Sequence, residues 1–181
     1  MKEKIYFTKV NTAFGEITII WMRMNDPRIQ RILLPSQKNM LHTTYPLATR
    51  STSKEISEYA ENIVYFLEGE DRRFSLERLD LDLCSKFQRR VIIAEYGIPR
   101  GFVSTYGRIA QYLGHPQSSR AVGRALATNL FPLVIPCHRA VKSSGELGGY
   151  QGGLGMKKRL LEMEGIRFIS DSLVEMDRVY Y

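Results

Sequence analysis

The sequence predicts two small domains, an α/β domain over residues 1–84 and a mostly α-helical domain over residues 85–181. Three observations lead to this division. Residues 4–34 contain stretches rich in Ile, Val, Thr, Tyr and Phe, which are typical of strands. Residues 53–67 carry apolar side chains at helical spacing. From Ser85 onward, short helical patterns are separated by Pro and Gly.

The first domain is expected to be a small antiparallel sheet with one helix. Strands are predicted over 4–10, 15–22 and 28–34, and the polar residues 35–53 are expected to form a loop. A helix should follow over 53–67, where Thr52 and Glu55 have the spacing of a capping box. One more extended segment is expected over 74–83. No motif in this domain indicates a chemical function.

The second domain begins with three predicted helices. Ser85 and Gln88 again have capping-box spacing, and the helix they open should end before residues 99–101. Further helices are predicted over 105–114 and 120–129. Two short helices joined by a tight turn that contains Gly form a helix-turn-helix pattern. Such pairs also occur in proteins that do not bind DNA.

The helix over 120–129 has unusually small side chains in its first turns. Glycine inside a helix costs about 1 kcal/mol relative to alanine. Ala121 and Gly123 would let this helix approach another surface closely, which could be a neighbouring helix or a nucleic acid. Arg120 and Arg124, one turn apart, favour contact with phosphates or with a groove.

Composition narrows the class of protein. Hydrophobic residues make up 44% and charged residues 25%, which is typical of a folded soluble protein. The net charge of +7 favours polyanionic partners without predicting a fold. No apolar run is long enough for a membrane span, and the N-terminus lacks the features of a signal peptide, so we expect an intracellular protein. Two cysteines are too few for a disulfide framework. Together with only three histidines, they make a structural zinc site unexpected.

The candidate nucleophile is Cys137. Residues 131–136 are apolar and bracketed by proline, and we expect them to form a buried strand that leads into Cys137 and His138. A thiol reacts as its thiolate, so a nearby base is needed. Because adjacent side chains on a strand point to opposite faces, His138 is expected to act through a bridging water or a local bend. The alternative is a structural cysteine beside a hydrogen-bonded histidine.

A carboxylate that could assist His138 lies on the next predicted helix, over 156–164. Leu160, Leu161 and Glu164 share one face of that helix. Glu164 is therefore placed on the apolar side and in the last turn, where the helix dipole disfavours a negative charge. A partner such as His138 is expected. The alternative is a side chain that bends out to solvent.

A glycine-rich segment over 145–153 separates Cys137 from this helix. Its backbone can close around a planar ligand, with Tyr150 stacking on it. The spacing does not match the phosphate loop of dinucleotide-binding proteins, and no βαβ unit surrounds it.

Together these residues closely resemble the O6-alkylguanine-DNA alkyltransferases, also called methylated-DNA–protein-cysteine methyltransferases. The resemblance is strong over 87–165 and only general over the first 80 residues. It implies a ribonuclease H-like first domain and a winged-helix-like second domain. The residues that carry it are Ile135-Pro136-Cys137-His138-Arg139-Ala140, Thr105-Tyr106, Arg120-Ala121-Val122-Gly123, Asn129, Gly149-Tyr150, Gly152-Gly153-Leu154, Lys157, Leu160-Leu161 and Glu164-Gly165.

The resemblance implies a set of catalytic roles. Cys137 would accept the alkyl group, and His138 would activate it through a water while Glu164 holds the imidazole. Asn129 would brace the backbone near the site. Tyr106 would donate to N3 of the departing guanine. The remaining catalytic position is a cation that polarises the site, Lys157.

The resemblance also implies how DNA is bound. Arg120 would fill the gap left in the base stack when the nucleotide is flipped. Tyr150 and Gln151 would line the base pocket together with Ala140; many family members have Ser at the position of Gln151, which leaves the pocket size open. Further DNA-binding positions are Gln88, Gly107, Ala121, Gly123, Arg124 and Ser143.

The implied activity is DNA repair by transfer of an alkyl group from O6-alkylguanine, and from O4-alkylthymine, in double-stranded DNA to Cys137. Each molecule would act once, as a monomer without cofactor or metal, in the cytoplasm or, in a eukaryote, the nucleus. Three alternatives stay open. One is a related sensor that binds lesions without transfer, although such proteins lack the acceptor cysteine. The others are a Cys-His hydrolase, which leaves Arg120 without a role, and a DNA-binding regulator, which leaves Cys137, His138 and Glu164 without one.

Overall fold

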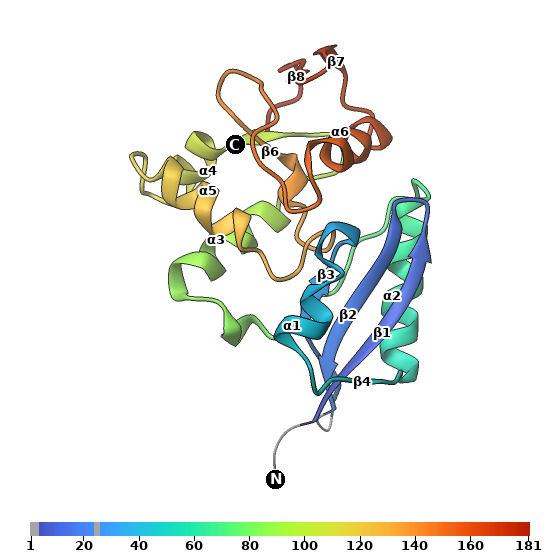
Figure 1. Cartoon of the computed structure of the whole chain (residues 1–181). Coiled ribbons are helices and arrows are strands. Elements are labelled where there is room, and N and C mark those ends of the chain that lie inside the picture. Colours follow the sequence, from blue (N-terminus) through green and yellow to red (C-terminus); the bar gives the residue numbers. More distant parts are fainter. Residues whose placement is uncertain (1–3, 24–25) are drawn as a thin grey trace. The chain divides into compact units, whose positions relative to one another are not determined.

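The computed structural model describes residues 4–23 and 26–181. The chain forms two compact units (Figure 1). The N-terminal unit consists of Met1–Leu83 together with the short segment Leu130–Val134, and the C-terminal unit consists of Cys84–Asn129 and Ile135–Tyr181. None of the helices in the described part of the chain has the length and apolar character needed to span a membrane.

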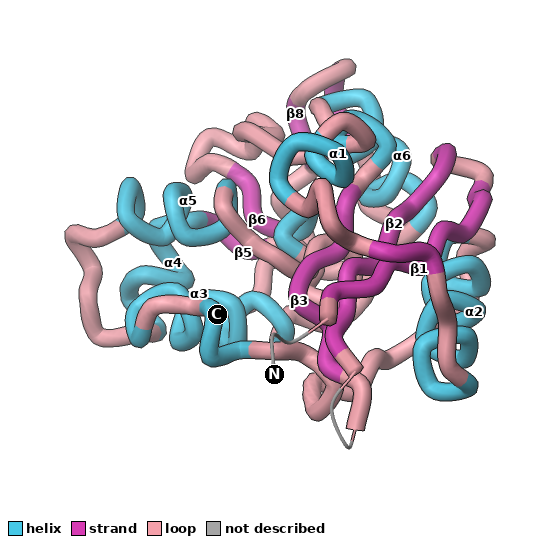
Figure 2. The backbone as a smooth tube through the Cα atoms, turned by 60° about the horizontal axis from the view of Figure 1, so that its bottom comes forward, coloured by secondary structure: helices cyan, strands magenta, loops and turns pink. Residues whose placement is uncertain are grey.

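The N-terminal unit is built on a four-stranded sheet with the order β3-β2-β1-β4. Its strands are β1 (Ile5–Thr12), β2 (Gly15–Met22), β3 (Arg28–Leu33) and β4 (Thr49–Arg50). Strands β1, β2 and β3 are antiparallel neighbours, and Figure 2 shows them side by side. Strand β4 pairs parallel with β1, so the sheet is mixed and the expectation of a purely antiparallel sheet was wrong.

Helix α2 (Lys54–Leu67) packs against β1 through its apolar face. Its cap is Ser53, whose hydroxyl accepts the Ile56 N–H at 3.3 Å, rather than the predicted Thr52. The apolar spacing that predicted this helix therefore located it correctly, with the cap one residue later.

The expectation of a loop over 35–53 was wrong in part. This stretch contains a 3₁₀ turn (η1, Pro35–Gln37), helix α1 (Met40–Thr44) and strand β4. Leu41 packs with Ile20 and Leu33 of the sheet, so contacts with distant residues stabilise structure that local periodicity does not indicate.

Residues 74–83 run beside β3 but form no regular strand. The Ile29 N–H donates to the Arg78 carbonyl at 2.7 Å, and the Asp80 N–H donates to the Ile29 carbonyl at 2.9 Å. A 3₁₀ turn (η2, Leu81–Leu83) follows. Cys84, the next residue, is partly exposed.

The C-terminal unit begins with three helices that pack on one another, α3 (Lys86–Tyr96), α4 (Tyr106–Tyr112) and α5 (Ser119–Ala127) (Figure 1). The hydroxyls of Ser85 and Thr105 cap α3 and α4 by accepting the N–H groups three residues on. Helix α6 (Leu154–Met163) closes with Gly165 in the left-handed region at φ +83°.

Two short strand pairs complete this unit. Strand β5 (Ser104–Thr105) pairs parallel with β6 (Ala140–Val141), and β7 (Phe168–Ser170) pairs antiparallel with β8 (Leu173–Val174). The first pair joins the segment before α4 to the segment after Cys137.

The buried strand expected to lead into Cys137 is absent from the structure of residues 131–139. Leu133 has a positive φ of 75°, which turns the chain, and Cys137–Arg139 form a 3₁₀ turn (η3). The two prolines of this segment favour such a turn because they cannot donate backbone hydrogen bonds to a sheet. The three side chains of η3 are therefore not held in the alternating directions of a strand.

Candidate active site

Cys137 lies at the wall of a cavity of about 560 Å³ within the C-terminal unit. Cys137 is 4% exposed, so it is almost entirely buried apart from its place in the cavity wall. The cavity is lined by Tyr106, Arg120, Gly123, Arg124, Leu126, Ala127, Cys137, Gly149, Tyr150 and Gln151. A volume of this size is in the range of small-molecule sites and exceeds what a single methyl group needs.

Asn129 binds the thiol through a hydrogen bond. Its side-chain amide donates to the Cys137 Sγ at 3.3 Å and to the Ile135 carbonyl at 3.2 Å. Burial raises the pKa of the Cys137 thiol to about 12, and the hydrogen bond from Asn129 acts in the opposite direction. At neutral pH the thiol is therefore protonated, and reaction requires that its proton be removed.

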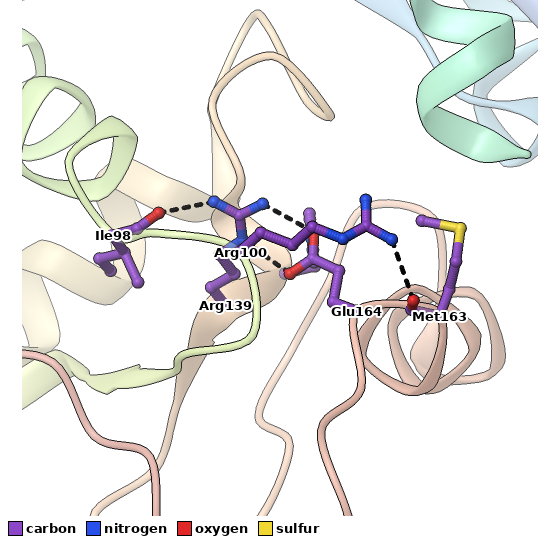
Figure 3. A network of polar contacts seen from close by, with 6 residues as sticks. Ile98, Arg100, Arg139, Met163 and Glu164 are labelled. Carbon is purple, nitrogen blue, oxygen red and sulfur yellow. Dashed lines mark hydrogen bonds and ion pairs between the residues drawn. The ribbon is translucent and has the colours of Figure 1, made fainter. Parts of the chain in front are cut away.

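His138 and Arg139, which follow Cys137 in sequence, form a buried polar cluster with Glu164 at the end of α6. His138 Nε2 lies 2.9 Å from Glu164 Oε1. Arg139 binds the same carboxylate at both oxygens, Nε to Oε2 at 2.8 Å and Nη2 to Oε1 at 2.7 Å. Its third contact is a 2.6 Å hydrogen bond from Nη1 to the Ile98 carbonyl, as Figure 3 shows. Glu164 is thus the common acceptor of both side chains.

The protonation states in this cluster follow from its burial and its partners. Burial opposes the carboxylate form of Glu164, but interaction with His138, through charge and hydrogen bond, and then with Arg139 lowers its pKa to about 2. Burial lowers the pKa of His138, with Glu164 acting in the opposite direction. A neutral imidazole beside an ionised carboxylate donates its Nε2–H, which leaves Nδ1 as the proton acceptor.

Lys157 is a buried cation held by backbone carbonyls. Its Nζ donates to the Ala140 carbonyl at 2.6 Å, to the Leu147 carbonyl and to the Gly149 carbonyl at 3.5 Å. Burial lowers the pKa of Lys157 to about 8, while the negative forms of Cys137 and Glu95 act to raise it. The ammonium therefore fixes the glycine-rich segment and favours a negative charge on the thiol.

Tyr106 stands between two glycines at the cavity. A Cβ on Gly148 would lie 2.7 Å from the Tyr106 hydroxyl, and a Cβ on Gly123 would lie 3.9 Å from the ring. Only the absence of a side chain at Gly148 leaves room for the phenol. Burial raises the pKa of Tyr106 to about 12, so its hydroxyl stays a hydrogen-bond donor at neutral pH.

Tyr150 and Gln151 close the cavity from the glycine-rich segment. The Tyr150 ring meets the His138 ring edge-on, with centroids 6.3 Å apart. The Gln151 side chain donates to the Asn129 carbonyl at 2.8 Å. Through this bond Gln151 is tied to the same residue that holds the thiol.

Helix α5 supplies the opposite side of the cavity. Arg120 and Arg124 are exposed and line it, the buried Leu126 also contributes to its wall, and Val122 is buried in the core. Gly123 lies between the two arginines on the cavity side. The small residues of this helix therefore leave the thiol accessible beside two positive charges.

Nine of the predicted site residues do not line this cavity, and four of these are the buried His138, Glu164, Asn129 and Lys157 described above. Gln88 joins α3 to α5 by donating to the Ala125 carbonyl at 3.3 Å and the Thr128 carbonyl at 3.1 Å. Ala140 is fully buried, and its carbonyl binds Lys157. The other three are Gly107, Ala121 and Ser143.

Sequence reasoning assigned no role to two residues that the structure places near the site. Arg139 was quoted only as part of a motif, although it makes two of the three side-chain contacts to Glu164. Glu95 lies fully buried on α3. Its position four residues after Val91, on the buried face, was the available signal.

Comparisons with known proteins show which family the chain belongs to. Residues 86–166 match the family model described as the DNA-binding domain of 6-O-methylguanine DNA methyltransferase. The methylated-DNA–protein-cysteine methyltransferase of Mycobacterium leprae is 41% identical over 130 residues, which are 69% of this chain and 76% of that protein. The chain belongs to the methylated-DNA–protein-cysteine methyltransferase family.

Two further comparisons place the chain within this family. A methyltransferase of the same name from Methanothermobacter thermautotrophicus is 48% identical over 111 residues, which are 61% of this chain and 62% of that protein. The crystal structure of Mycobacterium tuberculosis OGT in complex with DNA superposes with a TM-score of 0.73 at 29% identity, covering 88% of this chain and 92% of that one. The alkyltransferase fold, a mixed sheet with helices, therefore extends beyond the matched domain.

Proposed function

We propose that this chain repairs DNA by moving the alkyl group of O6-alkylguanine, and of O4-alkylthymine, onto the Cys137 sulfur. The observation that carries the proposal is the placement of Cys137 at a cavity, with the Asn129 amide on its sulfur and the His138–Glu164 pair beside it. The membership of the methyltransferase family supports the same reaction.

The transfer is a nucleophilic substitution at the alkyl carbon. The thiol proton passes through a water to His138 Nδ1, and Glu164 stabilises the imidazolium that results. A new S–C bond forms as the C–O bond to guanine breaks. The Tyr106 hydroxyl, which stays protonated, donates to N3 of the departing base, and the Lys157 ammonium favours the thiolate. No group in this scheme removes the alkyl group, so each chain acts once.

DNA is expected to bind across helix α5. The pair α4–α5 would act as a helix-turn-helix, with α5 in the minor groove because its small residues permit a close approach. Arg120 lies at the cavity mouth and would fill the base stack after the damaged nucleotide is flipped out. The net charge of +7 supports attraction to the phosphates.

The proposal also assigns a fold to each domain and places DNA binding and alkyl transfer in the second. Residues 85–181 would carry DNA binding and alkyl transfer in a winged-helix-like fold, and residues 1–84 would form a ribonuclease H-like α/β domain. The protein would act as a monomer in the cytoplasm, or in the nucleus of a eukaryote. The lesion-binding sensor is the second candidate, and the presence of Cys137 favours the transferase over it.

Stoichiometry tests the proposal. The protein is mixed with an excess of duplex that carries a radiolabelled O6-methylguanine, and the label on the protein is followed with time. We expect a plateau at one methyl group per chain. Release of methyl into solution with repeated turnover would contradict the single-use mechanism, and binding without label transfer would favour the sensor.

A further inference from the structure

Glu95 is a buried carboxyl group to which the reaction scheme above assigns no role. It is 0% exposed and lies in the second half of α3. Neither of its carboxyl oxygens has a hydrogen-bond partner among the residues that the structure describes. A buried polar group in this condition is costly, and in native proteins it calls for an explanation such as a role in the site.

The surroundings of Glu95 connect it to the segment that holds the thiol. Helix α3 packs against η3, the turn that contains Cys137. Ala94 of α3 and Ile98, which follows the end of the helix, belong to the same apolar cluster as Cys137. The Arg139 guanidinium also bonds the Ile98 carbonyl at 2.6 Å. The carboxyl group thus belongs to the helix that packs against the turn containing Cys137.

Five ionisable groups share this buried region with Glu95. Arg139 of η3 and Lys157 of α6 act on its charge, and its charge acts on Cys137, Tyr106 of α4 and Tyr181. Helix α5 contributes the apolar Val122, Ala125 and Leu126 to the cluster that contains Ala94 and Cys137. Both cations are already bound elsewhere, Arg139 to Glu164 and Lys157 to backbone carbonyls.

Two charge states of the site follow. Burial raises the pKa of Glu95 to about 8, so the group is largely neutral at neutral pH. With Glu95 neutral, the Lys157 ammonium is left to favour the thiolate of Cys137. With Glu95 ionised, its negative charge raises the pKa of Cys137 further.

We propose that the protonation state of Glu95 controls alkyl transfer. The protonated carboxyl group permits formation of the Cys137 thiolate, and the ionised carboxylate suppresses it. The inference rests on the proposed function in so far as the thiolate is the group that accepts the alkyl. Glu95 acts through the electrostatic environment of Cys137 and does not touch the substrate.

The test is a ratio of rates for Glu95→Gln and the wild-type chain, measured from about pH 6.5 to about pH 9.5 on either side of the Glu95 pKa of about 8. Two reactions are followed: methyl transfer from duplex O6-methylguanine, and modification of Cys137 by iodoacetamide, located by peptide mass spectrometry so that Cys84 does not interfere. Glu162→Gln, which removes an exposed carboxylate of α6, is the matched control.

We expect the rate of Glu95→Gln divided by that of the wild-type chain to stay near one at the acid end. At the alkaline end the variant should be about tenfold faster, as a thiol pKa lower by one unit would produce. Glu95→Leu should give the same profile if Glu95→Gln does not fold, and the control should give a ratio near one throughout. A ratio independent of pH in both reactions would overturn the proposal. If the wild-type chain transfers no methyl group, the proposed function fails, and the iodoacetamide ratio alone decides the role of Glu95.

Discussion

The Asn129 amide donates a hydrogen bond to the Cys137 sulfur at 3.3 Å. The same amide binds the Ile135 carbonyl, so one side chain fixes both the backbone before the thiol and the thiol itself. A donor on sulfur stabilises the thiolate more than the thiol. It acts against the burial that raises the pKa of Cys137.

Replacing Asn129 by Ala should slow alkyl transfer by about tenfold to a hundredfold, because the thiolate loses its donor. The Ile135 carbonyl also loses one donor but keeps the Cys137 backbone N–H, at a cost of about 0.5–1.5 kcal/mol in the free energy of unfolding. Single-turnover rates with duplex O6-methylguanine and urea denaturation measure the two effects. Asn62→Ala on the exposed face of α2 is the control. A transfer rate equal to that of the control would show that the Asn129–sulfur contact has no part in the reaction.

Glu164→Gln should destabilise the fold by about 3–5 kcal/mol, because the buried Arg139 guanidinium loses its ionised partner. In the wild-type chain, the same interaction should be lost when acid protonates Glu164. The Glu164 pKa falls from 4.5 to about 2 on folding, so its stabilisation is complete above pH 4.5 and is lost as the pH falls toward 2.

Thermal unfolding at several acid pH values measures this loss. Glu164→Gln should lack the corresponding part of the pH dependence. Glu146→Gln, which removes an exposed ion pair with Lys142, should behave like the wild-type chain. Parallel pH profiles for Glu164→Gln and the wild type would contradict the assignment.

Gly148→Ala should lower both stability and transfer rate. Gly148 has φ +65°, and its Cβ would lie 2.7 Å from the Tyr106 hydroxyl, so the phenol must move. The left-handed conformation alone costs a non-glycine residue about 1–2 kcal/mol. Gly149→Ala is a close control, because that Cβ would have no heavy atom within 4 Å and no positive φ is required. Equal transfer rates for the two variants would mean that the position of Tyr106 does not matter.

Arg120→Ala should weaken the reaction with duplex DNA and spare the reaction with a small free-base substrate such as O6-benzylguanine. The arginine would support the flipped-out state, which costs a few kcal/mol, so a loss of about 10- to 100-fold is expected with duplex only. Arg50→Ala, at an exposed position of β4, is the control. A similar loss with the free base would place Arg120 in the chemistry instead of in DNA binding.

Local patterns in the sequence predicted much of the secondary structure. The β-branched and aromatic composition of 15–22 located β2 at both ends, and apolar spacing located α2 to within one residue. Helix α1 and strand β4 could not be predicted in the same way, because they are held by contacts with distant residues such as Ile20 and by pairing with β1.

The contacts between site residues were also only partly predictable from local sequence patterns. Glu164 was expected to need a cationic or hydrogen-bonding partner, and His138 lies within 2.9 Å of it. The second partner, Arg139, could not be distinguished from the rest of its motif because a strand was expected there. The 3₁₀ turn of residues 137–139 is what allows both side chains to reach one carboxylate.

The most direct test of the account is the mass of the intact chain after incubation with duplex O6-methylguanine, followed by peptide mapping. We expect a gain of one methyl group in place of one proton, located on Cys137 and absent from Cys137→Ser. A methyl group found on Cys84 or on any other residue, or repair of the duplex with no change in protein mass, would contradict it.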